Sequence, residues 1–177
     1  MKRSAFTMLE LIFVIIVIGI LAVFAMPNFN RHPLQEAAEQ VASHIRYTQH
    51  LAMVDDKFDP SNANWWQRKW QLTIAGTSYN VYSDINENGG FDAGEAAVDP
   101  LTKTPISAVD LAAKYGITTI TAKTLAFDNM GRPYNGFTTD VYTDIITAET
   151  NVTLTHNDGT AIITVQPETG YVSVTYP

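Results

Sequence analysis

Residues 5–27 read AFTMLELIFVIIVIGILAVFAMP, and this stretch decides the fold that the sequence predicts. The run from Phe6 to Met26 holds 21 residues and a single charge, Glu10. As an α-helix it would be about 31 Å long, because a helix rises about 1.5 Å per residue, and this length matches the hydrocarbon core of a bilayer. The sequence therefore predicts a transmembrane helix over residues 6–27.

The charges at the start of the chain indicate a role for Glu10 and an orientation of the predicted helix in the membrane. A charge within a transmembrane helix costs about 2.5 to 3.5 kcal/mol on insertion scales, so we expect Glu10 to have a partner. The alternative is that Glu10, one turn inside the membrane, extends to the interface and does nothing else. The leader, residues 1–5, carries Lys2 and Arg3. Basic residues stay on the cytoplasmic side, so everything after Pro27 is expected outside the cytoplasm.

A short basic leader followed by Phe6-Thr7-Met8-Leu9-Glu10 resembles the N-terminal signal of type IV prepilins and of the pseudopilins of type II secretion. The resemblance implies that a prepilin peptidase cuts between Ala5 and Phe6, and that the new N-terminus at Phe6 is methylated. The family usually has glycine before the cut, where this chain has Ala5. In such filaments the carboxylate equivalent to Glu10 pairs with the N-terminal amine of a neighbouring subunit, and this pairing selects the axial stagger.

Two ordinary interpretations compete with this one. A secretory signal peptide would use Val23-Phe24-Ala25 as its cleavage site, and a plain single-pass anchor would need no processing. Neither has a reason to keep a glutamate in the apolar run. Composition excludes further classes of protein. A formal net charge of −7 argues against a nucleic-acid clamp, and the absence of cysteine excludes disulfides and thiol chemistry. No hydrolase, zinc-protease or P-loop motif is present, so we expect no active site.

The stretch 28–55 is predicted to continue the first helix. Pro27 and residues 28–33 favour a kink or bend, after which helical spacing returns. Histidines at positions 44 and 50 are six residues apart, off the spacing of a helical metal pair, so solvated side chains are expected there. The apolar stripe of this amphipathic half consists of Leu34, Ala37, Ala38, Val41, Ile45, Thr48, Leu51 and Ala52.

Residues 56–177 have the alternation and the turn residues of an antiparallel β-rich domain. Lys69–Ala75 and Tyr79–Ser83 predict a hairpin. Further strands are expected over 117–127, 151–156, 160–165 and 171–175, with turns at 157–159 and 167–170. The predicted fold class is therefore α+β: a long N-terminal helix, transmembrane half plus amphipathic half, packed on a C-terminal antiparallel domain. The predicted segments are a leader 1–5, a filament-core helix 6–27, an amphipathic continuation 28–55 and a periplasmic domain 56–177.

A second chemical signal lies in residues 84–95, DINENGGFDAGE, which fit the twelve-residue calcium-loop pattern D-x-[DN]-x-[DN]-G-x5-E. Gly89 would supply the sharp turn of the loop. No flanking helices are predicted, so this would be a calcium loop between strands, with an affinity of roughly 10⁻⁴ to 10⁻³ M. The alternative is a surface turn whose Asp and Asn side chains bond their own backbone. The expected ligands are Asp84, Asn86, Asn88, Gly90, Asp92 and Glu95.

The second half also resembles the GspH/FimT branch of minor pseudopilins, through residues 127–133 (FDNMGRP) and 163–172 (ITVQPETGYV). The resemblance implies a subunit of a pseudopilus or pilus in the bacterial inner membrane, with its C-terminal domain in the periplasm. Its partners would be other pilins, the prepilin peptidase and the inner-membrane assembly platform. The alternatives are a DNA-uptake module at a pilus tip and a plain membrane-anchored domain. DNA binding would require a basic cluster from Arg68, Lys69, Lys103, Lys114, Lys123 and Arg132, which are dispersed in the sequence.

Overall fold

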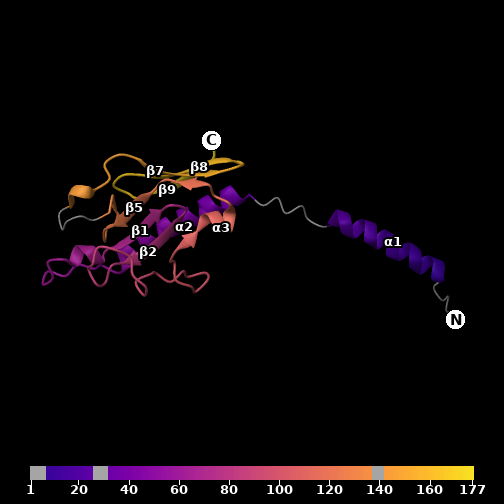
Figure 1. The fold of residues 1–177 in the computed structure, drawn as a ribbon, viewed down its shortest axis with the longest axis horizontal. Coiled ribbons are helices and arrows are strands. Elements are labelled where there is room, and N and C mark those ends of the chain that lie inside the picture. Colours follow the sequence, from indigo (N-terminus) through magenta and orange to yellow (C-terminus); the bar gives the residue numbers. More distant parts are fainter. Residues whose placement is uncertain (1–6, 26–31, 137–141) are drawn as a thin grey trace. The chain divides into compact units, whose positions relative to one another are not determined.

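The computed structural model describes residues 7–25, 32–136 and 142–177. The chain divides into two compact units, residues 1–31 and 32–177, and each is described by itself. The first unit holds helix α1, Met8–Ala25, and the second holds every other helix and strand (Figure 1).

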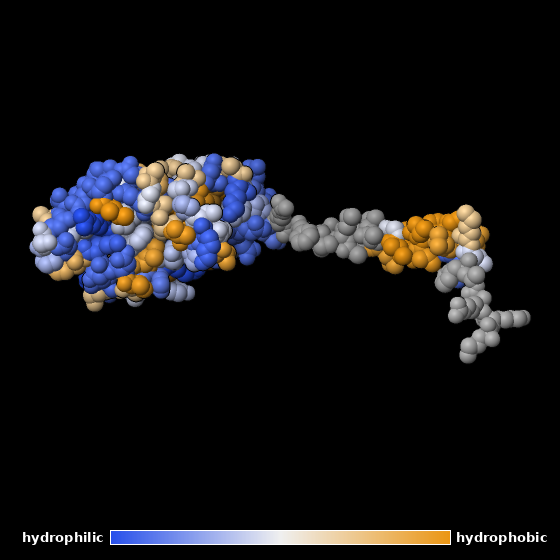
Figure 2. All heavy atoms as spheres, turned by 90° about the horizontal axis from the view of Figure 1, so that it is seen from below, coloured by the Kyte–Doolittle hydropathy of each residue, from blue (hydrophilic) through white to orange (hydrophobic). Residues whose placement is uncertain are grey.

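Helix α1 is apolar on every side. All described side chains from Met8 to Leu21 are exposed, and Figure 2 shows hydrophobic atoms over the visible surface of this helix. In the same view the second unit is mostly hydrophilic, with separate apolar spots. Helix α1 therefore buries none of its described side chains within its own unit.

The prediction of one long helix with a transmembrane half is wrong. Helix α1 ends at Ala25, and the next helix begins at Pro33 in the other unit. The 18 residues of α1 rise about 27 Å, less than the roughly 30 Å of a hydrocarbon core. Within the described ranges, no helix combines the length and apolarity needed to cross a membrane.

Helix α2, Pro33–Val54, is the central element of the second unit. Pro33 occupies the first turn, where its missing N–H leaves no helical hydrogen bond unmade. The predicted stripe is buried except for Leu51, which is half-buried. His44 is also buried, at 8% exposure, so the expectation of a solvated side chain is wrong there.

Two antiparallel sheets pack with α2. The first has the order β3-β2-β1-β5-β6, formed by β1 Trp70–Ala75, β2 Ser78–Ser83, β3 Val109–Asp110, β5 Lys123–Phe127 and β6 Pro133–Tyr134. The second has the order β4-β7-β8-β9, formed by β4 Thr119–Ile120, β7 Thr150–His156, β8 Gly159–Val165 and β9 Val172–Thr175. Among the described strands, none belongs to both sheets. Three short helices complete the unit: η1 Trp65–Arg68, α3 Leu111–Tyr115 and η2 Tyr142–Asp144.

Side chains of α2 join the two sheets. The helix contacts strands of both, and it runs alongside them in the domain (Figure 1). The Nε2 of Gln49 donates to the carbonyl of Gly131, after β5, at 2.8 Å and to that of Thr169, before β9, at 2.9 Å. Arg46 Nη2 donates to the carbonyl of Val172 at 3.0 Å. The core between them is one apolar cluster drawn from α2 and both sheets.

The predicted hairpin is confirmed as β1 and β2, and β7, β8 and β9 occur where strands were expected. The single strand expected over residues 117–127 is wrong. The chain instead forms β4 in one sheet and β5 in the other, because Thr121 bonds to Thr153 of β7 while Lys123 pairs with Ile74 of β1. The β-branched residues of 117–127 form one continuous run in the sequence, but the chain passes from one sheet to the other within it.

Candidate functional site

The charged residue of α1 lies in its first turn. The backbone N–H of Glu10 donates to the carbonyl and to the hydroxyl of Thr7, at 3.1 and 3.3 Å. A carboxylate is favoured there, because the N-terminus of a helix carries a partial positive charge. No described residue forms an ion pair with Glu10. Ala5 and Phe6, the predicted cleavage and methylation sites, lie outside the described residues.

Two buried carboxylates close the loop 84–95. Asp84 and Glu95 are 1% and 7% exposed. Asp84 accepts the N–H groups of Asn88 at 3.2 Å and of Gly89 at 2.7 Å. Glu95 accepts those of Ile85, Asn86 and Asp92, at 2.9, 3.2 and 3.0 Å. The two ends of the loop are therefore held by charge-assisted hydrogen bonds to its own backbone.

The other expected calcium ligands lie in the same loop. The carboxamides of Asn86 and Asn88 both donate to Asp92 Oδ2, and these bonds hold the pKa of Asp92 below its usual value. Gly89 adopts φ +86°, as the predicted sharp turn requires. An antiparallel bridge between Tyr82 and Ala96 flanks the loop, so its context is β as expected.

The loop's oxygens are thus turned to its own N–H groups, which is the arrangement of the surface-turn alternative. Among the described residues, no group of three or more His, Cys, Asp or Glu side chains is arranged to hold a metal. Asp84 and Glu95 nevertheless have no ion pair with a described Lys or Arg side chain. Calcium binding by this loop stays a prediction.

The FDNMGRP segment has a structural role that sequence reasoning missed. Asp128 is 1% exposed and accepts the N–H groups of Met130 and Arg132, both at 2.9 Å. Its Oδ2 accepts Arg132 Nε at 2.7 Å and the hydroxyl of Tyr134 at 3.1 Å. One carboxylate therefore fixes the turn between β5 and β6. An aspartate directly after a strand, followed by glycine three residues later, was the available signal.

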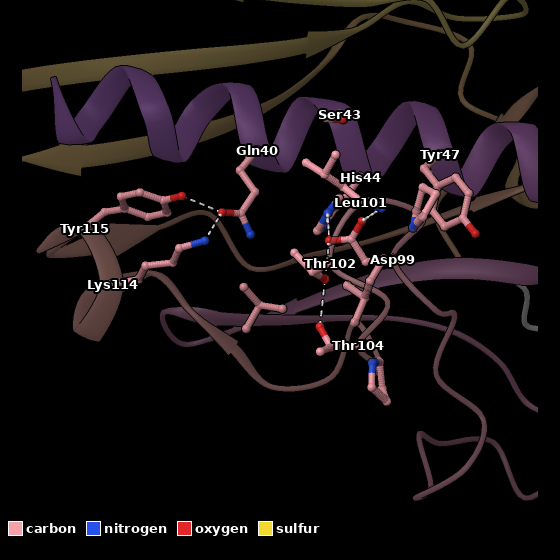
Figure 3. Close-up of a pocket in the computed structure, with 14 residues that line it drawn as sticks. Gln40, Ser43, His44, Tyr47, Asp99, Leu101, Thr102, Thr104, Lys114 and Tyr115 are labelled. Atoms are coloured by element: carbon pink, nitrogen blue, oxygen red, sulfur yellow. Dashed lines mark hydrogen bonds and ion pairs between the residues drawn. The ribbon is translucent and has the colours of Figure 1, made fainter. Parts of the chain in front are cut away.

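A cavity of about 670 Å³ beside α2 was also missed. Figure 3 shows Gln40, His44 and Tyr47 reaching it from α2, opposite the loop that holds Asp99. Lys114, from α3, closes one end. His44 stands three residues after Val41 and four before Thr48, so its place on the buried stripe could have been read from the sequence.

A network of hydrogen bonds lines this cavity. The Lys114 ammonium, which can only donate, bonds Gln40 Oε1 at 2.7 Å. Gln40 Nε2 donates to the Tyr79 hydroxyl at 3.0 Å, and this hydroxyl shares a hydrogen bond of 2.8 Å with His44 Nδ1. His44 Nε2 lies 3.8 Å from Asp99 Oδ2.

Burial determines the protonation states of His44 and Tyr79 in this hydrogen-bond network. It lowers the pKa of His44, which Asp99 raises in part, and it raises the pKa of the Tyr79 hydroxyl. Both groups are therefore neutral near pH 7. The hydrogen bonds of this network connect α2 to α3, and His44 of α2 lies beside Asp99 of the facing loop. One face of this network is open to the cavity.

The basic residues that DNA binding would need are mostly engaged elsewhere. Arg68 Nε pairs with Glu87 at 2.6 Å, and Arg132 pairs with Asp128. Lys69 is 6% exposed with its ammonium 4.6 Å from the Trp65 ring centroid, and Lys114 bonds Gln40. These contacts give the DNA-uptake alternative no support.

Comparisons with protein-family models, with curated proteins and with solved structures give no match for this chain.

Proposed function

We propose that this chain is a pilin-like subunit that assembles through helix α1 into a filament of the type II secretion or type IV pilus class. The observation that carries the proposal is α1 itself. It is an apolar helix whose described side chains are all exposed, it belongs to a separate unit from the folded domain, and it holds one carboxylate. Burying such a helix among copies of itself removes apolar surface from water at about 25 cal/mol per Å².

Glu10 gives the assembly its register. After cleavage of the leader the chain would begin at Phe6, whose amine is positively charged. In a bundle of α1 helices neither this amine nor Glu10 is stable alone, so each carboxylate pairs with the amine of a neighbour. The partners in this proposal are other pilins, the prepilin peptidase and the inner-membrane assembly platform, and the domain 32–177 lies outside the cytoplasm. No catalytic role is proposed.

Processing tests the proposal directly. In cells that contain a prepilin peptidase, the mature chain is expected to begin at Phe6 and to carry one methyl group there, because the basic leader and residues 6–10 fit that enzyme's signal. Mass spectrometry of the purified chain reads out both changes. An Ala5→Leu variant, with a bulky residue before the cut, should keep its leader, and an Ala5→Gly control should be cut as well as the unmodified chain. A mature chain beginning at Met26 would instead show ordinary secretion.

For the loop 84–95 we propose one bound calcium ion, supported by the complete ligand spacing and by two buried carboxylates that form no ion pair with a described Lys or Arg side chain. Calcium should raise the melting temperature of the full chain over the value in chelator, because an ion seen only by the folded state stabilises it. At ten times Kd the gain is about 1.4 kcal/mol. Magnesium should do less, since it needs a tight octahedral cage and releases its waters reluctantly.

Matched variants separate this binding from a general effect of salt. Glu95→Gln should lose most of the calcium-induced shift, whereas Asp158→Asn, at an exposed turn outside the loop, should keep it. Each shift is measured against the same variant in chelator, so a change in intrinsic stability does not enter the comparison. Equal melting curves of the unmodified chain with calcium and with chelator would leave the loop as a surface turn.

A further inference from the structure

The outer face of the first sheet is built from polar side chains in register. Leu72 and Ile74 of β1 are buried, so Gln71 and Thr73, which alternate with them along the strand, lie on the opposite face. Gln71 lies opposite Tyr82 of β2. Thr73 lies between Asn80 of β2 and Thr124 of β5. The pleat thus forms two cross-strand rows of amide, hydroxyl and phenol groups.

These rows form the floor of a groove. The hollow has a volume of about 460 Å³, and its remaining walls come from Gly89, Gly90 and Phe91 of the loop 84–95 and from Asn135 and Gly136 after β6. Ligand sites in proteins are usually clefts of about 300 to 1,000 Å³, so the groove is large enough for one or two small rings. It is separate from the cavity beside α2, with which it shares no lining residue.

The hydrogen-bonding capacity of the groove is largely unused. The side chains of Gln71 and Asn135 form no hydrogen bond with any described residue. Asn80 uses only its oxygen, which accepts the N–H of Ala108 at 2.6 Å, so its amide N–H₂ stays available. Thr73 and Thr124 share one hydrogen bond of 3.3 Å, and the Thr73 side chain also bonds the Tyr82 hydroxyl. Each free carboxamide offers two donors and an acceptor.

The groove is also uncharged. None of its lining residues is Asp, Glu, Lys, Arg or His, although the chain has 18 acidic and 11 basic residues. An ion that entered would lose hydration without meeting a counter-charge, which is unfavourable. An apolar molecule would cover free amide groups without satisfying them, which is unfavourable as well. The complementary ligand is neutral and carries several groups that both donate and accept.

One apolar surface completes the match. The rings of Tyr82 and Phe91 pack edge to face, with centroids 5.3 Å apart and planes at 69°. Tyr82 is 5% exposed, so the half-buried Phe91 supplies most of the accessible apolar surface. A sugar ring has hydroxyls around its edge and C–H groups on its face, so it can use the carboxamides and the Phe91 ring together. We infer that this groove binds a neutral saccharide. The inference needs only the fold of the second unit and is independent of the filament proposal.

The test uses the full-length chain, kept in solution by a detergent whose headgroup carries no sugar. Glucose, galactose, mannose and N-acetylglucosamine are titrated singly, as are maltose and cellobiose, with chelator present throughout so that no calcium ion in the loop 84–95 attracts a charged sugar. Saturation-transfer NMR detects binding, and calorimetry gives the dissociation constant. At least one of these sugars is expected to bind saturably, and a disaccharide that binds more tightly than its monosaccharide would identify a chain as the natural ligand. Glucuronate and glucosamine, the charged analogues, are expected to bind at least tenfold more weakly.

Variants locate the binding. Gln71→Ala and Asn135→Ala should each weaken it about tenfold, because each removes a carboxamide that bonds a sugar hydroxyl. Neither side chain holds the fold together through a hydrogen bond to a described residue, so melting temperatures should be unchanged. Asn157→Ala, an exposed carboxamide in the β7–β8 turn, should bind like the unmodified chain. The inference is overturned if no sugar binds at concentrations up to about a hundred millimolar, if glucuronate binds as well as glucose, or if both groove variants keep full affinity.

Discussion

Replacing Glu10 by alanine is expected to reduce incorporation of the chain into filaments by more than about a hundredfold. The variant leaves a neighbour's N-terminal amine without its partner inside an apolar bundle, and breaking a buried ion pair in this way costs about 3 to 5 kcal/mol. The domain 32–177 should fold unchanged, because no described residue pairs with Glu10. The effect should therefore be confined to assembly.

The absence of cysteine provides a clean measurement. A single Ile16→Cys change on α1 should give disulfide-linked dimers in the sheared filament fraction, and these should disappear when Glu10→Ala is added. Glu36→Ala is the matched control, since Glu36 is an exposed glutamate in the first turn of α2. Undiminished cross-linking of the Glu10 variant would show that this carboxylate is a bystander, while loss in the Glu36 variant too would indicate a general defect.

The largest expected loss of stability comes from Asp128→Ala. This change removes the Asp128 carboxylate, which accepts the N–H groups of Met130 and Arg132 and the hydroxyl of buried Tyr134. Each unmade buried bond costs about 1 to 3 kcal/mol, but Arg132 is partly exposed and can turn to water, so we expect about 3 kcal/mol in total. For a chain of this size that lowers the melting temperature by about 10 °C.

Two control variants isolate the role of the Asp128 carboxylate. Asp128→Asn keeps two acceptor lone pairs and the side-chain volume, so its loss should be about half as large. Asp158→Ala, with an exposed aspartate beside His156, should change the melting temperature by less than about 2 °C. A scan in which Asp128→Ala melts with the unmodified chain would contradict the proposed role of this carboxylate in the β5–β6 turn.

Elements with a strong local signal were predictable from the sequence. The stripe of α2 has clear periodicity, and the β7–β8 turn contains Asn157-Asp158-Gly159, so both were located within a few residues. The change of sheet between β4 and β5 was not predictable. The residue at the change, Thr121, is of the same type as several of its neighbours, and its partner Thr153 is distant in sequence. Long-range pairing, and not propensity, decides such a point.

The candidate sites divide in the same way. The spacing of residues 84–95 is local, so the loop, its turn at Gly89 and its β context could be predicted. The chain through Gln40, Tyr79 and Lys114 joins positions 39 and 74 residues apart, and no local pattern marks it. The prediction of one long first helix was wrong for another reason. Uniform apolarity from Phe6 to Met26 carries no information on where a helix ends, and α1 ends at Ala25.

The hydrogen bond from Arg46 to Val172 spans 126 residues, and that from Gln49 to Thr169 spans 120. Strand β9, which follows the other described strands of this unit in the sequence, thus completes the contacts of α2. A nascent chain that stops short of β9 exposes part of α2's apolar stripe, whatever sheet it has already formed. Folding of this domain is therefore a late event in its synthesis, with a high contact order, and its C-terminal residues are the segment on which cooperative closure depends.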